Sequence, residues 1–446
     1  MRATLSTVMA VTLWLVVPTG AAGQTAVPLS LEDAIRRGVA HDPRLAEARS
    51  NQVAASTDVT SKAALSHPTV TTSAGYLRTN HVPPYGVLEP NGTFNVIFPD
   101  IPNKYSTQAE VDVPLYTSHR VESLVDAARD NERASAADLS ASEQDVRLDI
   151  ARAYWGLVTA RENVRVLQQA LDREDAYVGD VKSRVDAGVL PPNDLLSAQA
   201  QRAREAVSLI QATNDAAVAQ IALGLLIGVG PDSVIEPTTR VDEALAGVSA
   251  LEHQTAVALA ASARDVRGER LGLQAREAGL FASATAALAS TKPTIGALAG
   301  VQPARPNERF VPPKDQWNVS WDLGVNVTWP VWDGGRAKAD AATATADADA
   351  LAHRIEQFDA QLALEVRQCL LDLGSSRAAL AASEEAVAAA TEAHRVVSER
   401  FRAGVATSTD VLDAQLALVQ AELERTQLLA GLRVNEARLL RAVGRL

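Results

Sequence analysis

The sequence predicts a mostly α-helical fold with a membrane β-barrel portion, and three observations support this class. The chain is duplicated internally, and each copy contains a very long segment without proline that is rich in strong helix formers. Each copy also contains segments of alternating apolar and polar residues, which are typical of membrane strands. Beyond the N-terminal region no run of about 18 apolar residues occurs, so only strands closed into a barrel are expected to cross a membrane.

The N-terminus predicts export from the cytoplasm. Arg2 precedes a short apolar run that ends in Pro, Gly and Ala residues. A basic start, an apolar core and small residues at its end form a secretory signal peptide. We place this peptide at residues 1–23, with cleavage between Ala22 and Ala26.

Composition excludes several classes of function. The formal net charge is −12 and is spread along the chain, which argues against nucleic acid as a partner because a phosphate backbone requires a basic surface. The single cysteine, Cys369, sits in a helical apolar pattern and is expected to be a small buried residue. The 7 histidines are scattered, and the sequence has no His-Glu-x-x-His, Gly-x-Ser-x-Gly or phosphate-loop motif. We therefore expect no catalytic residue, cofactor or metal site, and no enzymatic activity.

The duplication is visible as two matches at one offset. The segment Ser183–Gln199 corresponds to Glu399–Gln415, 216 positions later, and the same offset pairs Val113–Tyr116 with Trp329–Trp332. Two matches at one offset, with no gap between them, indicate a chain built from two copies of one unit.

The copies, at residues 27–240 and 241–446, are each expected to contain a helix, two strands, a very long helix, a tip turn and a last helix. The long helices are predicted from Arg120 to Ala187 and from Arg336 to Ala403, since neither stretch contains proline. At about 1.5 Å per residue each would be on the order of 100 Å long. Apolar residues at three-four spacing within them require partner helices. The first helices of the copies are predicted at Leu45–Leu65 and Leu271–Ala289.

Strand patterns predict the compartment. From Trp317 to Val331 every odd position is Trp, Val or Leu, and every even position is polar, small or Pro. At about 3.3 Å per residue this stretch would cross a membrane along a tilted path, and the tryptophans at its two ends match the aromatic girdles of a barrel. The segment from Gln108 to Leu115 alternates similarly and carries its acidic residues on one face, which suits a wet lumen. Four strands are expected, at about residues 69–78, 105–116, 294–302 and 317–332.

Polar connections join the predicted strands. Residues from Thr79 to Lys104 and from Gln302 to Gln316 are rich in Pro and Asn and are expected to be extracellular loops. Four strands cannot close a membrane barrel, because the smallest such barrels have about eight. Several chains must therefore contribute to one barrel, and three chains would supply twelve strands.

With these features the chain resembles the TolC-like outer-membrane efflux protein family, the outer membrane factors, over nearly all of the mature sequence. The resemblance is carried by the duplication, by Pro-Leu-Tyr and Pro-Val-Trp at the joints between strand and helix, and by the paired Ala-Gly-Val turns that precede an Asp. It implies a homotrimer with a twelve-stranded barrel surrounded by outer-membrane lipid, and a long α-helical barrel that continues through the periplasm. It also implies docking to a periplasmic adaptor (membrane fusion) protein and to an inner-membrane transporter that supplies the energy.

The function implied by the resemblance is a passive exit duct of a tripartite efflux pump or a type I secretion system, for small molecules or polypeptides. The alternative is a soluble periplasmic coiled-coil scaffold or adaptor protein. The alternative accounts for the helices but not for the alternation from Trp317 to Val331. Drugs, metals and secreted polypeptides all leave through ducts of this shape, so the cargo and the class of pump stay open.

The resemblance assigns adaptor docking to two turns at the periplasmic tip. A glycine is expected in each turn, because reversing two packed helices usually requires a residue in the left-handed conformation. The implied docking residues are Gly188, Val189, Leu190, Gly404, Val405 and Ala406.

The resemblance also assigns the periplasmic entrance to this end. The family carries a ring of aspartates at Asp-x-x-Asp spacing, which Asp410 and Asp413 reproduce on one helix face. Asp410 has a counterpart, Asp194, in the first copy, so capping or the helix dipole explains it about as well as a ring does. Asp413 corresponds to Ser197, and nothing in the turn requires an acid there. Asp413 is therefore the stronger candidate for a functional carboxylate.

In a well-studied relative, a Tyr and an Arg near this turn lock the entrance to an Asp of the neighbouring helix. Asp194 matches that Asp, but Phe401 stands at the position of the Tyr and Ala406 at that of the Arg. Two members of the lock are missing, and Arg402, close by in the sequence, is a candidate for a different closure.

Overall fold

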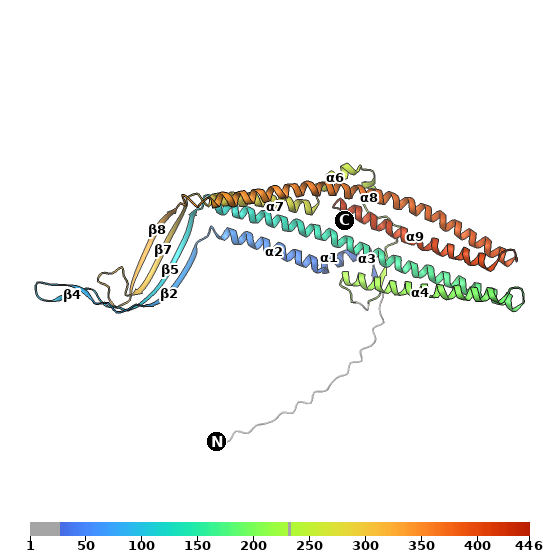
Figure 1. Ribbon diagram of the computed structural model, residues 1–446, viewed down its shortest axis with the longest axis horizontal. Helices are drawn as coiled ribbons and strands as arrows, with labels where there is room; N and C mark the ends of the chain where they lie inside the picture. Colours follow the sequence, from blue (N-terminus) through green and yellow to red (C-terminus); the bar gives the residue numbers. More distant parts are fainter. Residues whose placement is uncertain (1–26, 231–232) are drawn as a thin grey trace, which may run out of the picture. The chain divides into compact units, whose positions relative to one another are not determined.

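The computed structural model of the protein describes residues 27–230 and 233–446 (Figure 1). The expected signal peptide, at residues 1–23, lies outside these ranges. The chain forms two compact units, each built from both copies of the repeat. The tip unit contains the described residues up to Asp42, Asp149–Leu245 and Ser375–Val434; the sheet unit contains Pro43–Leu148, Ala246–Gly374 and Asn435–Leu446.

The two copies run through the same order of main elements. In the first copy these are α2 (Pro43–Ala64), β2 (Thr69–Arg78), β5 (Asn103–Tyr116), α3 (Arg120–Asp186) and α4 (Pro192–Leu226). In the second copy they are α7 (Gly268–Ala289), β7 (Thr294–Arg305), β8 (Asn318–Thr328), α8 (Arg336–Arg402) and α9 (Ser408–Ala442). Helices α3 and α8 have 67 residues each, and α4 and α9 have 35 each. These equal lengths follow from the single offset of the sequence repeat.

In the sheet unit the four main strands form one antiparallel sheet in the order β2-β5-β7-β8 (Figure 1). Residues that pair across neighbouring strands lie on the same face of a sheet. Glu110 pairs with Thr71 on one side and with Gly300 on the other, and Gly300 pairs with Asp322. The alternating polar positions of the strands therefore meet on one face, and β2 and β8 are the edges of this sheet.

The opposite face of the sheet is apolar and exposed in the single chain. Leu323 and Val325 of β8 are 74% and 68% exposed. At the loop end of this face the ring centroid of Tyr105 lies 5.0 Å from that of Tyr76 and 6.3 Å from that of Trp317. An apolar face with a row of aromatic rings at its end is the pattern of a surface that meets lipid.

The connection from Thr79 to Lys104 is not the plain loop that its composition predicted. It contains a hairpin of β3 (Tyr85–Leu88) and β4 (Phe94–Phe98), and β5 already begins at Asn103. The polar residues that suggested a loop include the turn of this hairpin, where Gly92 has a φ of 82° and Thr93 N–H donates to Asn91 Oδ1 at 3.0 Å.

Strand β8 is shorter than the alternation from Trp317 to Val331 predicted. It has 11 residues and ends at Thr328, two positions before Pro330. Proline has no N–H for the ladder, so the alternating pattern continues in the sequence beyond the point where strand pairing stops.

Short elements that were not predicted complete the fold. They are β1 (Val27–Leu29), α1 (Leu31–His41), β6 (Ile235–Pro237), α5 (Val248–Glu252) and α6 (Ala256–Arg264). In the tip unit β1 pairs in parallel with β6. The buried Tyr154 of α3 hydrogen-bonds to β1 and to the segment that follows β6. The Tyr154 hydroxyl donates to Leu29 O at 3.0 Å and accepts from Thr239 N–H at 3.0 Å.

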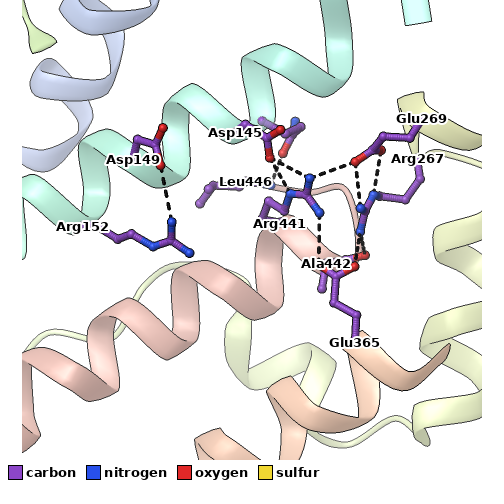
Figure 2. Close-up of polar contacts among 10 residues, drawn as sticks. Asp145, Asp149, Arg152, Arg267, Glu269, Glu365, Arg441, Ala442 and Leu446 are labelled. Carbon is purple, nitrogen blue, oxygen red and sulfur yellow. Dashed lines mark hydrogen bonds and ion pairs between the residues drawn. The ribbon is translucent and has the colours of Figure 1, made fainter. Parts of the chain in front are cut away.

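A cluster of ion pairs in the sheet unit holds the end of α9 (Figure 2). The Arg267 side chain is 4% exposed and reaches Glu269 at 2.8 Å and Glu365 at 3.1 Å. It also donates to the carbonyl of Ala442 at 3.0 Å. Arg441 of α9 contacts the same two carboxylates at 2.9 and 3.0 Å. We call these four charged side chains the C-terminal ion-pair cluster, which joins α7, α8 and α9.

By length and mean hydropathy, α4 is the one helix in the described ranges that is apolar enough to cross a membrane. A single helix of this kind is weak evidence for a membrane-spanning helix. In the structure α4 pairs with α3 instead. Arg202 contacts Asp175 at 2.5 Å, and Arg161 donates to Gln220 at 3.2 Å. These contacts assign α4 to an antiparallel hairpin with α3.

Cys369 on α8 is half-buried, where the sequence predicted a buried residue. Burial raises the pKa of its thiol to about 11, and the nearby carboxylates of Glu365 and Asp372 add to the rise. A thiol with such a pKa is protonated and unreactive at neutral pH.

Candidate functional site

Two turns of the tip unit, one in each copy, join the long helices to the last helices. In the first turn Gly188 N–H donates to Val185 O at 2.9 Å, and Val189 N–H donates to Arg184 O at 2.8 Å. The turn at Gly404 has the same two hydrogen bonds, at 3.0 and 2.9 Å. This pair of bonds is the Schellman motif, which ends a helix through a left-handed residue. The two glycines have φ values of 71° and 78°, and a β-carbon would meet nothing within 4 Å, so the backbone angle rather than space requires glycine.

The side chains beside these glycines divide into two kinds. Val189 and Val405 are exposed, whereas Leu190 and Ala406 pack against the core below the turns. Each turn therefore presents a glycine and a valine outward and is anchored by the next residue. Adaptor docking at these positions stays a prediction.

Both turns rest on one core, formed by Val181, Phe401 and Val411. Phe401, which stands at the position of the lock tyrosine of one relative, is buried in this core. Its ring centroid lies 5.5 Å from that of Tyr177, and the guanidinium carbon of Arg184 lies 4.9 Å from the Phe401 centroid. Phe401 thus links α8 to α3 through an aromatic contact and a cation–π contact.

Tyr177 was not singled out in the sequence, yet it holds the start of α9. Its hydroxyl donates to Ser408 O at 3.2 Å and lies 2.8 Å from Ser408 Oγ. Burial raises the pKa of Tyr177 to about 12, and the charges of Glu174, Asp194 and Asp180 add to the rise. No motif marks this tyrosine, because its role depends on which helix faces it.

The predicted entrance aspartates have different surroundings. Asp410 accepts hydrogen bonds from Thr407 N–H at 2.8 Å and from Thr407 Oγ1 at 2.7 Å, and its own N–H donates to Thr407 Oγ1 at 3.2 Å. This reciprocal pair is a capping box at the start of α9, and it holds the pKa of Asp410 below its ordinary value. Asp413 is exposed and has no hydrogen bond or ion pair among the residues described. Asp194 is half-buried in the first turn of α4. The capping role thus belongs to Asp410, and Asp413 stays the candidate ring carboxylate.

A cavity of about 420 Å³ lies beside Phe401 in the tip unit. Arg402, the candidate for a different closure, lines it together with Arg173, Asp180 and His394. Burial lowers the pKa of His394, and the charges of Arg173 and Arg402 lower it further, so this imidazole is neutral at neutral pH. The cavity therefore presents two guanidinium groups against one aspartate.

Comparison with known proteins identifies relatives over nearly the whole chain. The sequence matches the Outer membrane efflux protein family over residues 34–229 and 241–445. Protein CyaE of Bordetella pertussis is 27% identical over 426 residues, which cover 94% of this chain and 84% of CyaE. Outer membrane efflux protein BepC of Brucella suis is 22% identical over 364 residues, which cover 80% of this chain and 76% of BepC. The crystal structure of the outer membrane protein VceC from Vibrio cholerae matches with a TM-score of 0.74 at 19% identity, over 93% of this chain and 96% of that chain.

The two family matches fall on the two copies of the repeat, so the duplication is itself a family feature. The shared fold confirms the predicted class, and the soluble scaffold is not supported. The chain belongs to the outer membrane efflux protein family: it is an outer-membrane channel for efflux or secretion that extends into the periplasm.

Proposed function

We propose that three copies of this chain form one passive exit duct, with a twelve-stranded barrel in the outer membrane and the long helices around the periplasmic passage. The observation that carries this proposal is the sheet of β2, β5, β7 and β8, which has one polar face, one apolar face and two edges. A lone sheet in lipid would leave the backbone groups of its edge strands unpaired, at a cost of several kcal/mol for each group. Pairing of β8 with β2 of the next copy, repeated three times, pairs both edges and closes the sheet.

The two faces of the sheet support this assembly. Barrel strands alternate between residues that meet lipid and residues that meet the lumen. Leu323 and Val325 would meet lipid, whereas Glu110 and Asp322, on the other face, would meet water in the lumen. Burial of the apolar face in lipid removes from water a surface that is exposed in the described part of the single chain.

Adjacent residues of β8 provide the test. Val325 pairs with Ala297 and Asn326 pairs with Gly296, so the two side chains project to opposite faces. Val325→Arg would place a charge in lipid at a cost of about 2–4 kcal/mol near the mid-plane, whereas Asn326→Arg would place the same charge in water. We expect Val325→Arg to prevent formation of the heat-modifiable oligomer in outer-membrane fractions, and Asn326→Arg to assemble normally. Equal behaviour of the two variants would contradict the proposed faces.

In the same proposal the tip turns dock to a periplasmic adaptor protein. Each turn is closed by its own hydrogen bonds and exposes one valine, Val189 or Val405. A rigid turn with an exposed apolar side chain suits a contact that another protein buries. Cysteine cross-linking from Val189→Cys to a purified adaptor, in a Cys369→Ala background, tests this contact. Equal cross-linking from Asp172→Cys, an exposed position on α3, the helix that precedes this turn, would contradict it.

The channel is proposed to carry no catalytic function, and an inner-membrane transporter supplies the energy and selects the cargo. Three copies would bring Asp413 to the entrance three times. Carboxylates crowded in this way attract multivalent cations and repel anions. This ring would select by charge only, which is compatible with several classes of cargo.

A further inference from the structure

Two acidic residues of the tip unit are buried in the hairpin of α3 and α4. Glu174 of α3 is fully buried, and neither of its carboxylate oxygens has a hydrogen-bond donor. Glu205 of α4 is 6% exposed, and its Oε2 also lacks a donor. Neither residue forms an ion pair within the part of the chain that the structure describes. Ionised carboxylates are costly to bury without a partner, so this pair needs a compensating positive charge or a proton.

The two residues lie at the same level of the hairpin. The ion pair between Asp175 and Arg202, at 2.5 Å, fixes the alignment of the two antiparallel helices. Glu174 is next to Asp175, and Glu205 is one helical turn from Arg202, so both acids lie at the level of this ion pair. The charge of Glu205 acts on Glu174 and raises its pKa.

The surroundings of Glu174 favour its protonated form. The groups that act on it come from three helices: Asp175 of α3, Arg204 and Glu205 of α4, and Gln415 of α9. Burial raises the pKa of Glu174 to about 7, the neighbouring acids add to the rise, and Gln415 and Arg204 oppose it. The amide Nε2 of Gln415 donates to Ala170 O at 3.4 Å. His394 of α8 is half-buried, and its pKa is affected by Arg173, Glu422 and Arg402 and not by this pair. Burial also raises the pKa of Glu205, whereas Gln201, which donates to Glu205 Oε1 at 3.4 Å, and the charge of Arg173 oppose this rise.

The second copy of the repeat shows that the hairpin does not require these acids. The offset of 216 residues places Ala390 at the position of Glu174 and Ala421 at that of Glu205. The helices of the two copies nevertheless have equal lengths and end in the same turn. Two acids that are present together in one copy, and replaced together by alanine in the other, indicate a property added to the first hairpin.

We propose that Glu174 and Glu205 form a proton-sharing pair that makes the α3–α4 hairpin sensitive to pH. With one proton bound, the Glu174 carboxyl is the donor that Glu205 Oε2 lacks, and the pair carries a single negative charge. When this proton leaves to solvent, two buried carboxylates repel each other and the hairpin opens locally to admit water. Tyr177, one turn from Glu174, holds the start of α9, so the opening would reach the core below both turns.

The direction of the pH dependence follows from linkage. The folded-state pKa of Glu174, about 7, lies above its ordinary value of 4.5. The closed hairpin therefore binds a proton that the open form releases, and it is most stable below the ordinary value. This stabilisation declines as the pH rises and is lost through about pH 7.

Hydrogen exchange in the full-length protein, in detergent micelles between about pH 5.5 and 8.5, tests the proposal. After correction for intrinsic exchange, protection of the amides around Glu174 and Glu205 should fall about tenfold or more through about pH 7 in the wild type. Glu174→Gln keeps the shape and cannot lose a proton, so the fall in protection near pH 7 should be absent in this variant. Asp172→Asn is the matched control: Asp172 is exposed on the same helix and is not among the groups that act on Glu174, so the transition should persist.

Two further measurements keep the proposal falsifiable. Infrared difference spectra between the wild type and Glu174→Gln should show a protonated carboxyl band that disappears through about pH 7, and absence of this band would overturn the proposal. A divalent cation is the other charge that could compensate two carboxylates. If hydrogen exchange changes on addition of Mg²⁺ or a chelator but not with pH, the proton-sharing proposal is overturned in favour of a cation site. The double variant Glu174→Ala with Glu205→Ala, which copies the second hairpin, should fold and show no transition; a transition that survives there would also overturn the proposal.

Discussion

Replacing Arg267 with Met should loosen the end of α9. The Arg267 side chain is 4% exposed and contacts Glu269, Glu365 and the carbonyl of Ala442. Methionine keeps much of the side-chain volume and removes the charge. Removal of one partner of a buried ion pair costs about 3–5 kcal/mol, because the opposite charge stays buried. Arg441 still contacts both carboxylates, and their side chains are 28% and 37% exposed, so we place the cost at the lower end, about 3 kcal/mol.

Native-state hydrogen exchange in detergent micelles measures this cost where it arises. A cost of about 3 kcal/mol corresponds to roughly 100-fold faster exchange at residues 436–446, since each 1.4 kcal/mol or so is tenfold. Arg395→Met is the matched control, because Arg395 also contacts two carboxylates, Glu392 and Glu399, but its side chain is 54% exposed. That control should change exchange little, because an exposed ion pair contributes little to stability. Equal effects of the two substitutions, or unchanged exchange in Arg267→Met, would refute the reasoning that burial makes the cluster strong.

Three further predictions concern the tip unit. Replacing both Gly188 and Gly404 with Val should leave the oligomer in the outer membrane but abolish transport. Each valine in the left-handed conformation costs about 1–2 kcal/mol, and the docking surface changes shape. Loss of the oligomer would instead mean that the glycines are needed only for folding. In planar bilayers a trivalent cation on the periplasmic side should block the current, and Asp413→Ala should weaken this block without changing oligomer yield. Asp410→Ala should instead destabilise the start of α9, an effect that disappears as the pH falls through the lowered pKa of Asp410. An unchanged block in the double variant Asp410→Ala with Asp413→Ala would contradict the ring. Phe401→Ala should cost about 3–5 kcal/mol, measured as faster exchange at residues 397–411, and unchanged exchange there would contradict the shared core.

Elements whose signal is local could be predicted from the sequence. Helix α3 ends at Asp186 where Ala187 was predicted, because a glycine turn follows a long stretch without proline. The faces of β8 follow from its alternation, since neighbouring side chains of a strand project to opposite sides whatever packs against them. The sequence pattern places the end of β8 too far along the chain: the strand ends at Thr328, whereas the apolar alternation continues past Pro330.

Features that depend on tertiary neighbours could not be predicted. Phe401 was placed at a lock position by its match to a family motif, but its burial results from packing against α3 and α9. Glu174 stands in a charged run between Arg173 and Asp175 and has the sequence pattern of a solvated helix face. The packing of α4 and α9 against α3, which the sequence pattern does not show, removes it from water.

The equal lengths of α3 and α8 also restrict which insertions and deletions the chain can tolerate. Each residue of a helix adds about 1.5 Å and turns the helix by about 100°. Deletion of one residue from α8 would therefore rotate Phe401 away from Val181, while α3 would keep its own alignment. Deletion of about 7 or 11 residues, close to whole turns, would preserve both faces if made in both copies. The long helices can thus change length only by whole helical turns, and only when both copies of the repeat change at equivalent positions.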